Sequence, residues 1–181
     1  METELDAAHT VYHTRLLLPS DLDAMQGLFE RGADYFVIAT GNPPAPDEAR
    51  RAYVAGPPTK DVKAKRIVGI FADDALVGVL DALTDWPAEG TWTMGMLLLD
   101  PAHRGAGLGL ATLAAYERWA ASEGAQIYRT AIVAHHDAGA RFLQRAGYTC
   151  VSTDVRDAPE GSRPAVLFFQ KVVSTEEKGL S

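Results

Sequence analysis

The segment from Arg104 to Gly109 carries glycine at three alternating positions, which constrains the local backbone more than any other part of the chain. It lies between an apolar run, Met94 to Leu99, and a stretch from Leu108 onward with helical spacing of apolar residues. A strand, a glycine-rich turn and a helix in that order bring unpaired helical N–H groups and a backbone without Cβ atoms together. This arrangement predicts an anion site, with Arg104 as a cation at its mouth. The alternative is a sharp connection in which the glycines only avoid steric clashes and bind no ligand.

The length of 181 residues fits one domain, which we expect over residues 9–173. Residues 1–8 and 174–181 are expected to be flexible termini, and the first of them has the features of neither a secretory signal nor a membrane anchor. The sequence has one cysteine, Cys150, which excludes an intramolecular disulfide and a multi-cysteine zinc site. A single cysteine fits a reducing compartment, so a cytoplasmic protein is predicted.

The formal net charge of −7 argues against a general nucleic-acid surface, which would need clustered Lys and Arg. No apolar segment is long enough to span a membrane. Small-molecule partners are therefore expected, and an acidic surface would also suit a cationic substrate such as an amine. The adjacent pair His135 and His136 is a weak zinc signal, so no metal is predicted.

Apolar spacing and turn residues predict an α+β fold with a mostly antiparallel mixed sheet of about seven strands and about four helices. The one crossover surrounds the glycine turn. Residues 40–65, rich in Pro and Gly, are predicted to form either a functional flap around a short helix or a surface connection. Strands are expected at 11–18, 66–71, 76–83, 91–99, 126–133, 148–154 and 165–172, and helices at 20–31, 47–54, 108–122 and 138–146.

Two common nucleotide-binding turns do not fit this sequence. A dinucleotide-binding fingerprint needs G-x-G-x-x-G and an acidic residue about 20 positions later, whereas this chain has G-x-G-x-G and no acid closing the next strand. A Walker A loop ends in Gly-Lys-Ser/Thr, whereas Gly109 is followed by Leu110 and Ala111. Another kind of phosphate-binding turn remains.

The spacing Arg-x-x-Gly-x-Gly at Arg104, Gly107 and Gly109 resembles the GNAT superfamily of acyl-CoA-dependent N-acyltransferases. The segment from Ala138 to Tyr148 follows at the distance expected for that family. The resemblance implies the GNAT fold and transfer of an acetyl group from acetyl-CoA, as co-substrate, to a primary amine in a ternary complex. It also implies dimerisation as an option.

The resemblance further implies positions for the coenzyme. The pyrophosphate would lie on backbone N–H groups of the glycine turn beside Arg104, and the pantetheine arm would pair with the backbone of the preceding strand. The N–H of Leu97 would bind the thioester carbonyl as its oxygen becomes negative. The residues so assigned to the coenzyme are Leu97, Leu98, Leu99, Arg104, Gly105, Ala106, Gly107, Leu108, Gly109, His136 and Phe142.

Catalytic groups are less well defined. Many family members have a tyrosine four residues before the glycine that ends the second helix, but this chain has Leu143 there, so that general acid is missing. A thiol with a pKa of about 8.5 is a tolerable leaving group without it. Asp81 is the preferred general base because it is a charge within an apolar run, unless it lies on the solvated side of its strand. The other candidate bases are Asp34, Glu30, Glu89 and His136.

Asp34, Tyr35 and Trp92 are predicted to contact the acceptor, although aromatic residues at such positions also serve as core. The identity of the amine stays open. Two other functions remain as alternatives: a non-catalytic acyl-CoA-binding module, in which the missing tyrosine reflects lost turnover, and a partner-binding domain that binds no coenzyme.

Overall fold

The described residues of the computed structural model, 1–7, 10–56, 64–154 and 165–173, contain one mixed sheet and the helices around it. Its eight strands follow the order β1-β2-β3-β4-β5-β6-β8-β7. The strands are β1 (Thr3–Ala7), β2 (Thr10–Leu16), β3 (Lys65–Ala72), β4 (Ala75–Leu83), β5 (Thr91–Leu99), β6 (Ile127–Val133), β7 (Thr149–Asp154) and β8 (Val166–Val172). The helices are α1 (Leu22–Arg31), α2 (Ala33–Thr40), α3 (Glu48–Val54), α4 (Leu108–Ser122) and α5 (Asp137–Arg145).

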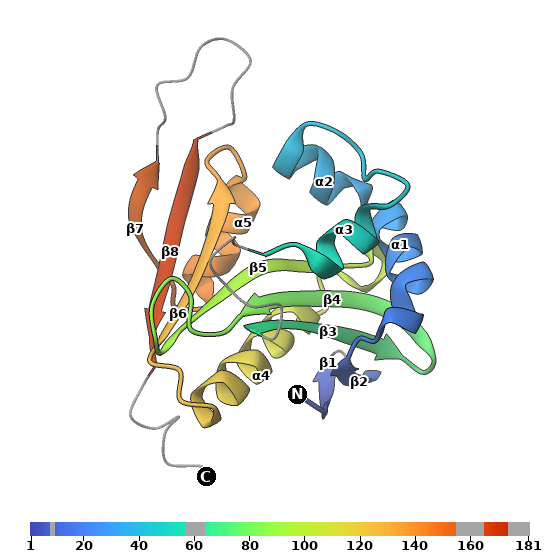
Figure 1. Ribbon diagram of the computed structural model, residues 1–181, viewed down its shortest axis with the longest axis horizontal. Helices are drawn as coiled ribbons and strands as arrows, with labels where there is room; N and C mark the ends of the chain where they lie inside the picture. The colour runs from blue at the N-terminus through green and yellow to red at the C-terminus, as the bar shows by residue number, and fades with distance from the viewer. Residues whose placement is uncertain (8–9, 57–63, 155–164, 174–181) are drawn as a thin grey trace.

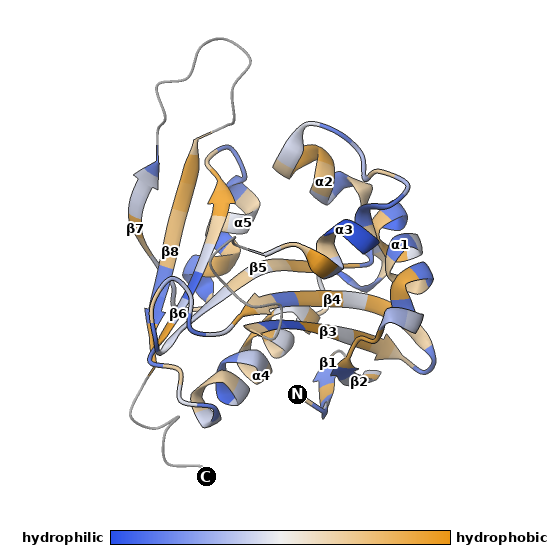
Figure 2. Cartoon of the chain, in the orientation of Figure 1, coloured by the Kyte–Doolittle hydropathy of each residue, from blue (hydrophilic) through white to orange (hydrophobic). Residues whose placement is uncertain are grey.

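Helices cover both faces of the central strands (Figure 1). On β4, Leu80 packs in a core with residues of α4 and α5, whereas its neighbour Val79 packs in a second core with residues of α1, α2 and α3. Because successive side chains of a strand point to opposite faces, a strand buried on both faces must be apolar throughout. Strands β3, β4 and β5 are accordingly mostly apolar (Figure 2).

The predicted fold class is confirmed, with a parallel pairing of β5 and β6 at the crossover and antiparallel pairing of the other neighbouring strands. Within the described residues, no helix has the length and apolarity needed to cross a membrane. The 57–63 part of the predicted flap, the turn predicted near 157–161 and the expected C-terminal tail at 174–181 lie outside the described residues.

Two elements differ from the sequence-based predictions. The N-terminus, expected to be flexible, contains β1, which pairs with β2 and buries Leu5 and Ala7. Those apolar residues alternate with Glu4 and Asp6, a short strand pattern that the acidic composition obscured. Helix α2 was also missed, because Gly32 ends α1 and the helix resumes at the next residue.

The sheet splits between β5 and β6. The two strands pair over Thr91–Met94 and Ile127–Thr130. Beyond that register β5 continues beside β4, and β6 continues beside β8, so the strands diverge (Figure 1). The register of β4 with β5 also shifts at this point and leaves Gly95 as the extra residue of a β-bulge. The bulge and the divergence open the sheet at its centre.

Candidate active site

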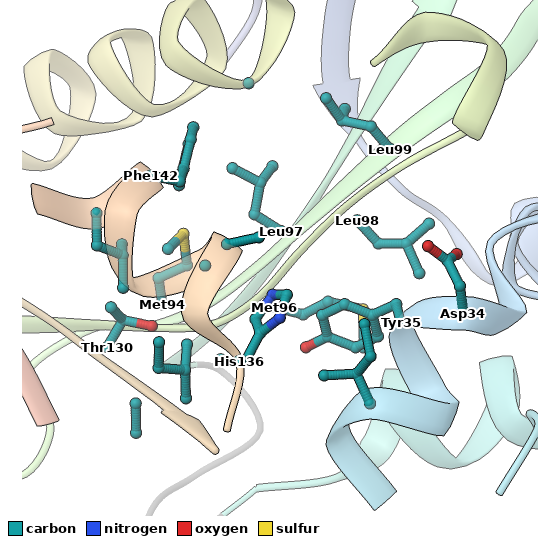
Figure 3. A pocket seen from close by; sticks show the side chains of 18 of the residues that line it. Asp34, Tyr35, Met94, Met96, Leu97, Leu98, Leu99, Thr130, His136 and Phe142 are labelled. Atoms are coloured by element: carbon teal, nitrogen blue, oxygen red, sulfur yellow. The ribbon is translucent and has the colours of Figure 1, made fainter. Parts of the chain in front are cut away.

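A cleft of about 410 Å³ occupies the opening between β5 and β6. Its walls are formed by the second half of β5, the end of β6, helix α2 and helix α5 (Figure 3). Most of the lining side chains are apolar, among them Met94, Met96, Leu97, Ile132 and Phe142. An apolar cleft with a few polar groups is typical of a small-molecule site.

Besides apolar side chains, β5 offers unpaired backbone groups to the cleft. Past Met94 the strand has no register with β6, although the segment Leu97–Leu99 lines the cleft. The side chain of Leu98 is fully buried in the core with α1 and α2. Because an unpaired strand edge can hydrogen-bond an extended ligand, these leucines can serve core packing through their side chains and binding through their backbones.

The glycine turn joins this strand edge to helix α4. Gly105 and Gly107 have φ values of 81° and 87°, which residues with a side chain rarely adopt. The Ala111 N–H donates to the Gly107 carbonyl at 3.0 Å as the helix begins. The N–H groups of Leu108, Gly109 and Leu110 therefore have no hydrogen-bond acceptor within α4, and they form the positive end of the helix dipole.

Close packing at the start of α4 also favours a glycine. Gly109 lines the cleft, and a Cβ atom there would lie 3.3 Å from the ring of Phe142 on α5. The side chain of Leu108 is fully buried, so that residue faces a ligand only through its backbone. The turn as a whole presents main-chain donors with little side-chain cover.

The guanidinium of Arg104 is already engaged. Its Nη2 donates to Asp34 Oδ1 at 2.9 Å, its Nη1 donates to Asp34 Oδ2, and its Nε donates to the Leu99 carbonyl at 2.9 Å. The pairing lowers the pKa of Asp34. Asp34 therefore lines the cleft as an ion-paired carboxylate, which suits neither a general base nor a free contact for a substrate cation.

A split sheet that leads to a glycine turn and a helix N-terminus can be compared with known proteins. The model of the acetyltransferase (GNAT) family matches residues 26–148. The chain belongs to this family. No curated protein matches the sequence.

Solved structures share this GNAT fold. An acetyltransferase from Thermus thermophilus is 20% identical, with a TM-score of 0.74 over 92% of this chain and 99% of that one. The ribosomal L7/L12 α-N-protein acetyltransferase RimL, solved with coenzyme A, is 14% identical, with a TM-score of 0.72 over 94% and 98%. The ribosomal-protein-S18-alanine N-acetyltransferase from Escherichia coli is also 14% identical, with a TM-score of 0.68 over 94% and 99%. At these identities the likeness establishes the fold alone.

Within this GNAT domain the side chain of Asp81 is only 16% exposed and is paired with Lys65, so the alternative of a solvated position is wrong. It lies on β4, and its Oδ2 is 3.0 Å from Lys65 Nζ, which also donates to the Ala55 carbonyl at 2.6 Å. Burial raises the pKa of Asp81 to about 6, against the opposing effect of Lys65. A Cβ atom on Gly95 would lie 3.7 Å from Oδ2, so the carboxylate is close to the cleft wall at Gly95, but Asp81 is not among the residues that line the cleft.

Two polar side chains face each other across the cleft from α2 and from the start of α5 (Figure 3). His136 precedes α5 and lines the cleft, and burial lowers its pKa. Burial raises the pKa of Tyr35 on α2 to about 12, with a further contribution from Asp81. At neutral pH Tyr35 is therefore a neutral hydroxyl, able to donate a hydrogen bond within the cleft.

Several predicted site residues lie elsewhere. Trp92 is buried in the core beside α4, with ring centroids 5.1 Å from Trp119 and 6.1 Å from Tyr116, so its prediction as an acceptor contact is wrong. Glu30 and Glu89 are exposed and do not line the cleft. In the described part of the chain, no three His, Cys, Asp or Glu residues form a group that could hold a metal ion.

Leu143, which the sequence resemblance identified as the position without the tyrosine general acid, lines the cleft as a buried apolar residue. The cleft also contains residues that sequence reasoning missed. Ile38 enters from α2, and Thr130 and Ile132 enter from β6. No local signal marks these three residues, since each joins the site only because the strands diverge.

Proposed function

We propose that this GNAT domain transfers the acetyl group of acetyl-CoA to a primary amine of a small-molecule acceptor by direct attack in a ternary complex. The proposal is carried by one observation: a cleft runs along the unpaired end of β5, and β5 leads into the glycine turn that begins α4. A strand edge suits the amide-bearing pantetheine arm, and a helix N-terminus suits a pyrophosphate.

The coenzyme in this proposal is held mainly by backbone. The N–H groups of Gly105, Ala106, Gly107, Leu108 and Gly109 would bind the pyrophosphate, and the backbone of Leu97, Leu98 and Leu99 would pair with the arm. Phe142 and His136 on the α5 side would flank it, as lining residues of the cleft. Arg104 would act beside the phosphates while it stays paired with Asp34.

In the reaction the amine nitrogen attacks the thioester carbon, a C–N bond forms, and the C–S bond then breaks to release the thiolate of coenzyme A. The Leu97 N–H would stabilise the oxyanion that forms on the carbonyl oxygen. Alignment of the two reactants supplies much of the rate, because well-oriented reactants gain about 7–11 kcal/mol over free ones. The acceptor nitrogen must also lose a proton before or during attack.

Asp81 is our choice for the group that takes this proton. Its raised pKa of about 6 keeps it ionised near neutral pH, yet makes it more basic than an exposed carboxylate. Because Asp81 does not line the cleft, the proton would reach it through water rather than by direct contact with the acceptor. Tyr35 would donate a hydrogen bond on the acceptor side of the cleft.

Calorimetric titration of the purified protein with acetyl-CoA tests the coenzyme site, with CoA, ATP and NAD as comparison ligands. We expect saturable one-site binding of acetyl-CoA and CoA, and none of ATP or NAD. Absence of acetyl-CoA binding would contradict the proposal and favour a partner-binding domain. Product formation is then measured across a panel of amines that includes antibiotics, polyamines and amino acids.

The presence of Leu143 at the position of the usual tyrosine favours a second candidate, a non-catalytic acyl-CoA-binding module. The two candidates share the coenzyme site and differ in turnover. Acetylation of any amine above the uncatalysed rate excludes the module. Tight coenzyme binding with no product from any acceptor would support it.

A further inference from the structure

Two ion pairs join the corner between α1 and α2, defined here as Arg31–Asp34, to the residues just before the glycine turn. The corner supplies the cation of one pair and the carboxylate of the other. Arg31 at the end of α1 pairs with Asp100, Nε to Oδ2 at 2.5 Å, and its Nη2 donates to the Leu76 carbonyl at 3.0 Å. In the other pair the charges are exchanged, because α2 supplies the carboxylate of Asp34 and the turn supplies Arg104. The corner is thus connected to both ends of the Pro101–His103 3-10 helix.

The backbone of the corner also packs directly on β5. A Cβ atom on Gly32, between the two helices, would lie 3.0 Å from Leu98 Cδ2. Leu98 is fully buried and belongs to the strand that lines the cleft. The first turn of α2 therefore rests on β5 on one side and is bonded to Arg104 on the other.

The hydrogen bonds of Arg104 define what this pair can do. All three guanidinium nitrogens donate within the protein, two of them to Asp34 and one to the Leu99 carbonyl. A two-point contact between Arg and a carboxylate is directional as well as strong. Arg104 thus bridges the end of β5 and the start of α2, and the next residues of α2 to enter the cleft are Tyr35 and Ile38.

We propose that Asp34 is a positioning residue: by holding Arg104 it fixes α2 on the glycine turn, so that occupation of the turn by coenzyme is transmitted to the acceptor side of the cleft. The inference rests on the proposed function, since it needs coenzyme in that turn. It gives Asp34 a role other than direct contact with a substrate. By linkage, a coenzyme that stabilises α2 also raises the affinity for an acceptor that uses α2.

Hydrogen exchange of the full chain, with and without saturating CoA, tests this coupling without knowledge of the acceptor. In the unmodified protein we expect CoA to slow amide exchange at residues 104–110 and, by about tenfold, at residues 33–40. In Asp34→Ala we expect protection at 104–110 to remain and protection at 33–40 to be lost. Asp34→Glu, which keeps a carboxylate, should recover part of the effect at 33–40.

A matched control is available at α3, where Arg51 and Asp47 form an exposed ion pair with 2.9 Å between Nε and Oδ2. This pair does not involve the glycine turn. Asp47→Ala should leave both responses to CoA unchanged. If Asp34→Ala melts before it can be measured, Asp34→Asn removes the charge of the same pair with little change of size and carries the same expectation.

The results separate the two proposals. If CoA slows amide exchange at residues 33–40 equally in Asp34→Ala and in the unmodified protein, the positioning role is overturned. It is also overturned if CoA binds the unmodified protein without any change of exchange in α2. Failure of the unmodified protein to bind CoA in the calorimeter refutes the coenzyme site itself. Loss of the α2 response in Asp34→Ala, with its retention in Asp47→Ala, supports the role of Asp34.

Discussion

The two sides of the cleft are built in different ways. The proposed coenzyme side consists of one continuous segment, from the end of β5 through the glycine turn into α4, and its polar groups are those of the backbone. The proposed acceptor side is formed by α2, which presents the side chains of Tyr35 and Ile38 to the cleft, and Asp81 of β4 lies behind its wall. A site made of backbone depends on local conformation, whereas a site made of side chains depends on how distant elements pack.

The source of the electrostatic potential also differs between the two sides of the cleft. At the glycine turn the positive potential comes from the helix end, and the one cation among the lining residues of the cleft, Arg104, is neutralised by Asp34. On the acceptor side, burial sets the protonation of Asp81 and Tyr35. The coenzyme side should therefore be sensitive to backbone strain and the acceptor side to changes of charge.

The largest expected effect is on the acceptor side. Asp81→Asn removes the proposed base without a change of size, and turnover should fall by about 100-fold or more. Calorimetry should show that its affinity for acetyl-CoA is unchanged. Turnover equal to that of the unmodified protein would exclude Asp81 as the base and leave His136 as the candidate.

The next effect is on the coenzyme side. Gly107→Val forces a β-branched residue into a φ of 87°, and a strain of about 2 kcal/mol would weaken acetyl-CoA binding by about 30-fold. Gly124→Val is the matched control, because Gly124 has a φ of 95°, also leaves open space within 4 Å of an added Cβ atom, and follows the other end of α4. Both variants should lose similar stability. Equal loss of affinity in both would reject the turn as the phosphate site.

A smaller effect concerns the pH dependence of turnover. As the pH rises through about 6, Asp81 loses its proton and becomes a competent base, so turnover should rise. The cation of Lys65 favours the ionised form, and Lys65→Met therefore raises the pKa of Asp81 further and shifts the rise to higher pH. Among the described residues, Tyr35 and Tyr116 also interact with Asp81, and both stay neutral in this range. Lys65→Arg keeps the cation, and its pH profile should match that of the unmodified protein.

The smallest functional effect is expected at Trp92. Because its side chain packs against α4 and away from the cleft, Trp92→Leu should leave acetyl-CoA affinity and acceptor KM unchanged. The loss of buried contacts should lower the free energy of unfolding by about 2–3 kcal/mol, as measured by denaturant titration. A raised acceptor KM in a folded Trp92→Leu protein would return this residue to the acceptor side.

The strand, glycine turn and helix of the proposed coenzyme side could be predicted from sequence because their signals are contiguous. The alternating glycines indicate residues with positive φ. The apolar run predicts the strand, and the helical spacing of the apolar residues after it predicts α4. The acceptor side could be predicted only in part. Tyr35 was found as an aromatic residue after α1, but the same reasoning placed Trp92 beside it, since a sequence does not show toward which core an aromatic ring of a doubly covered strand points.

Sequence by itself determined the fold class, the glycine turn and the family, all of which depend on periodicity and on backbone conformation within short segments. Tertiary structure decided that Asp34 pairs with Arg104, that Asp81 is buried beside Lys65, and that β1 joins the sheet at its edge. The partners in each ion pair are 70 and 16 residues apart in the chain, by subtraction of their residue numbers. The energy of such contacts depends on distance and burial, which arise only when the elements have packed.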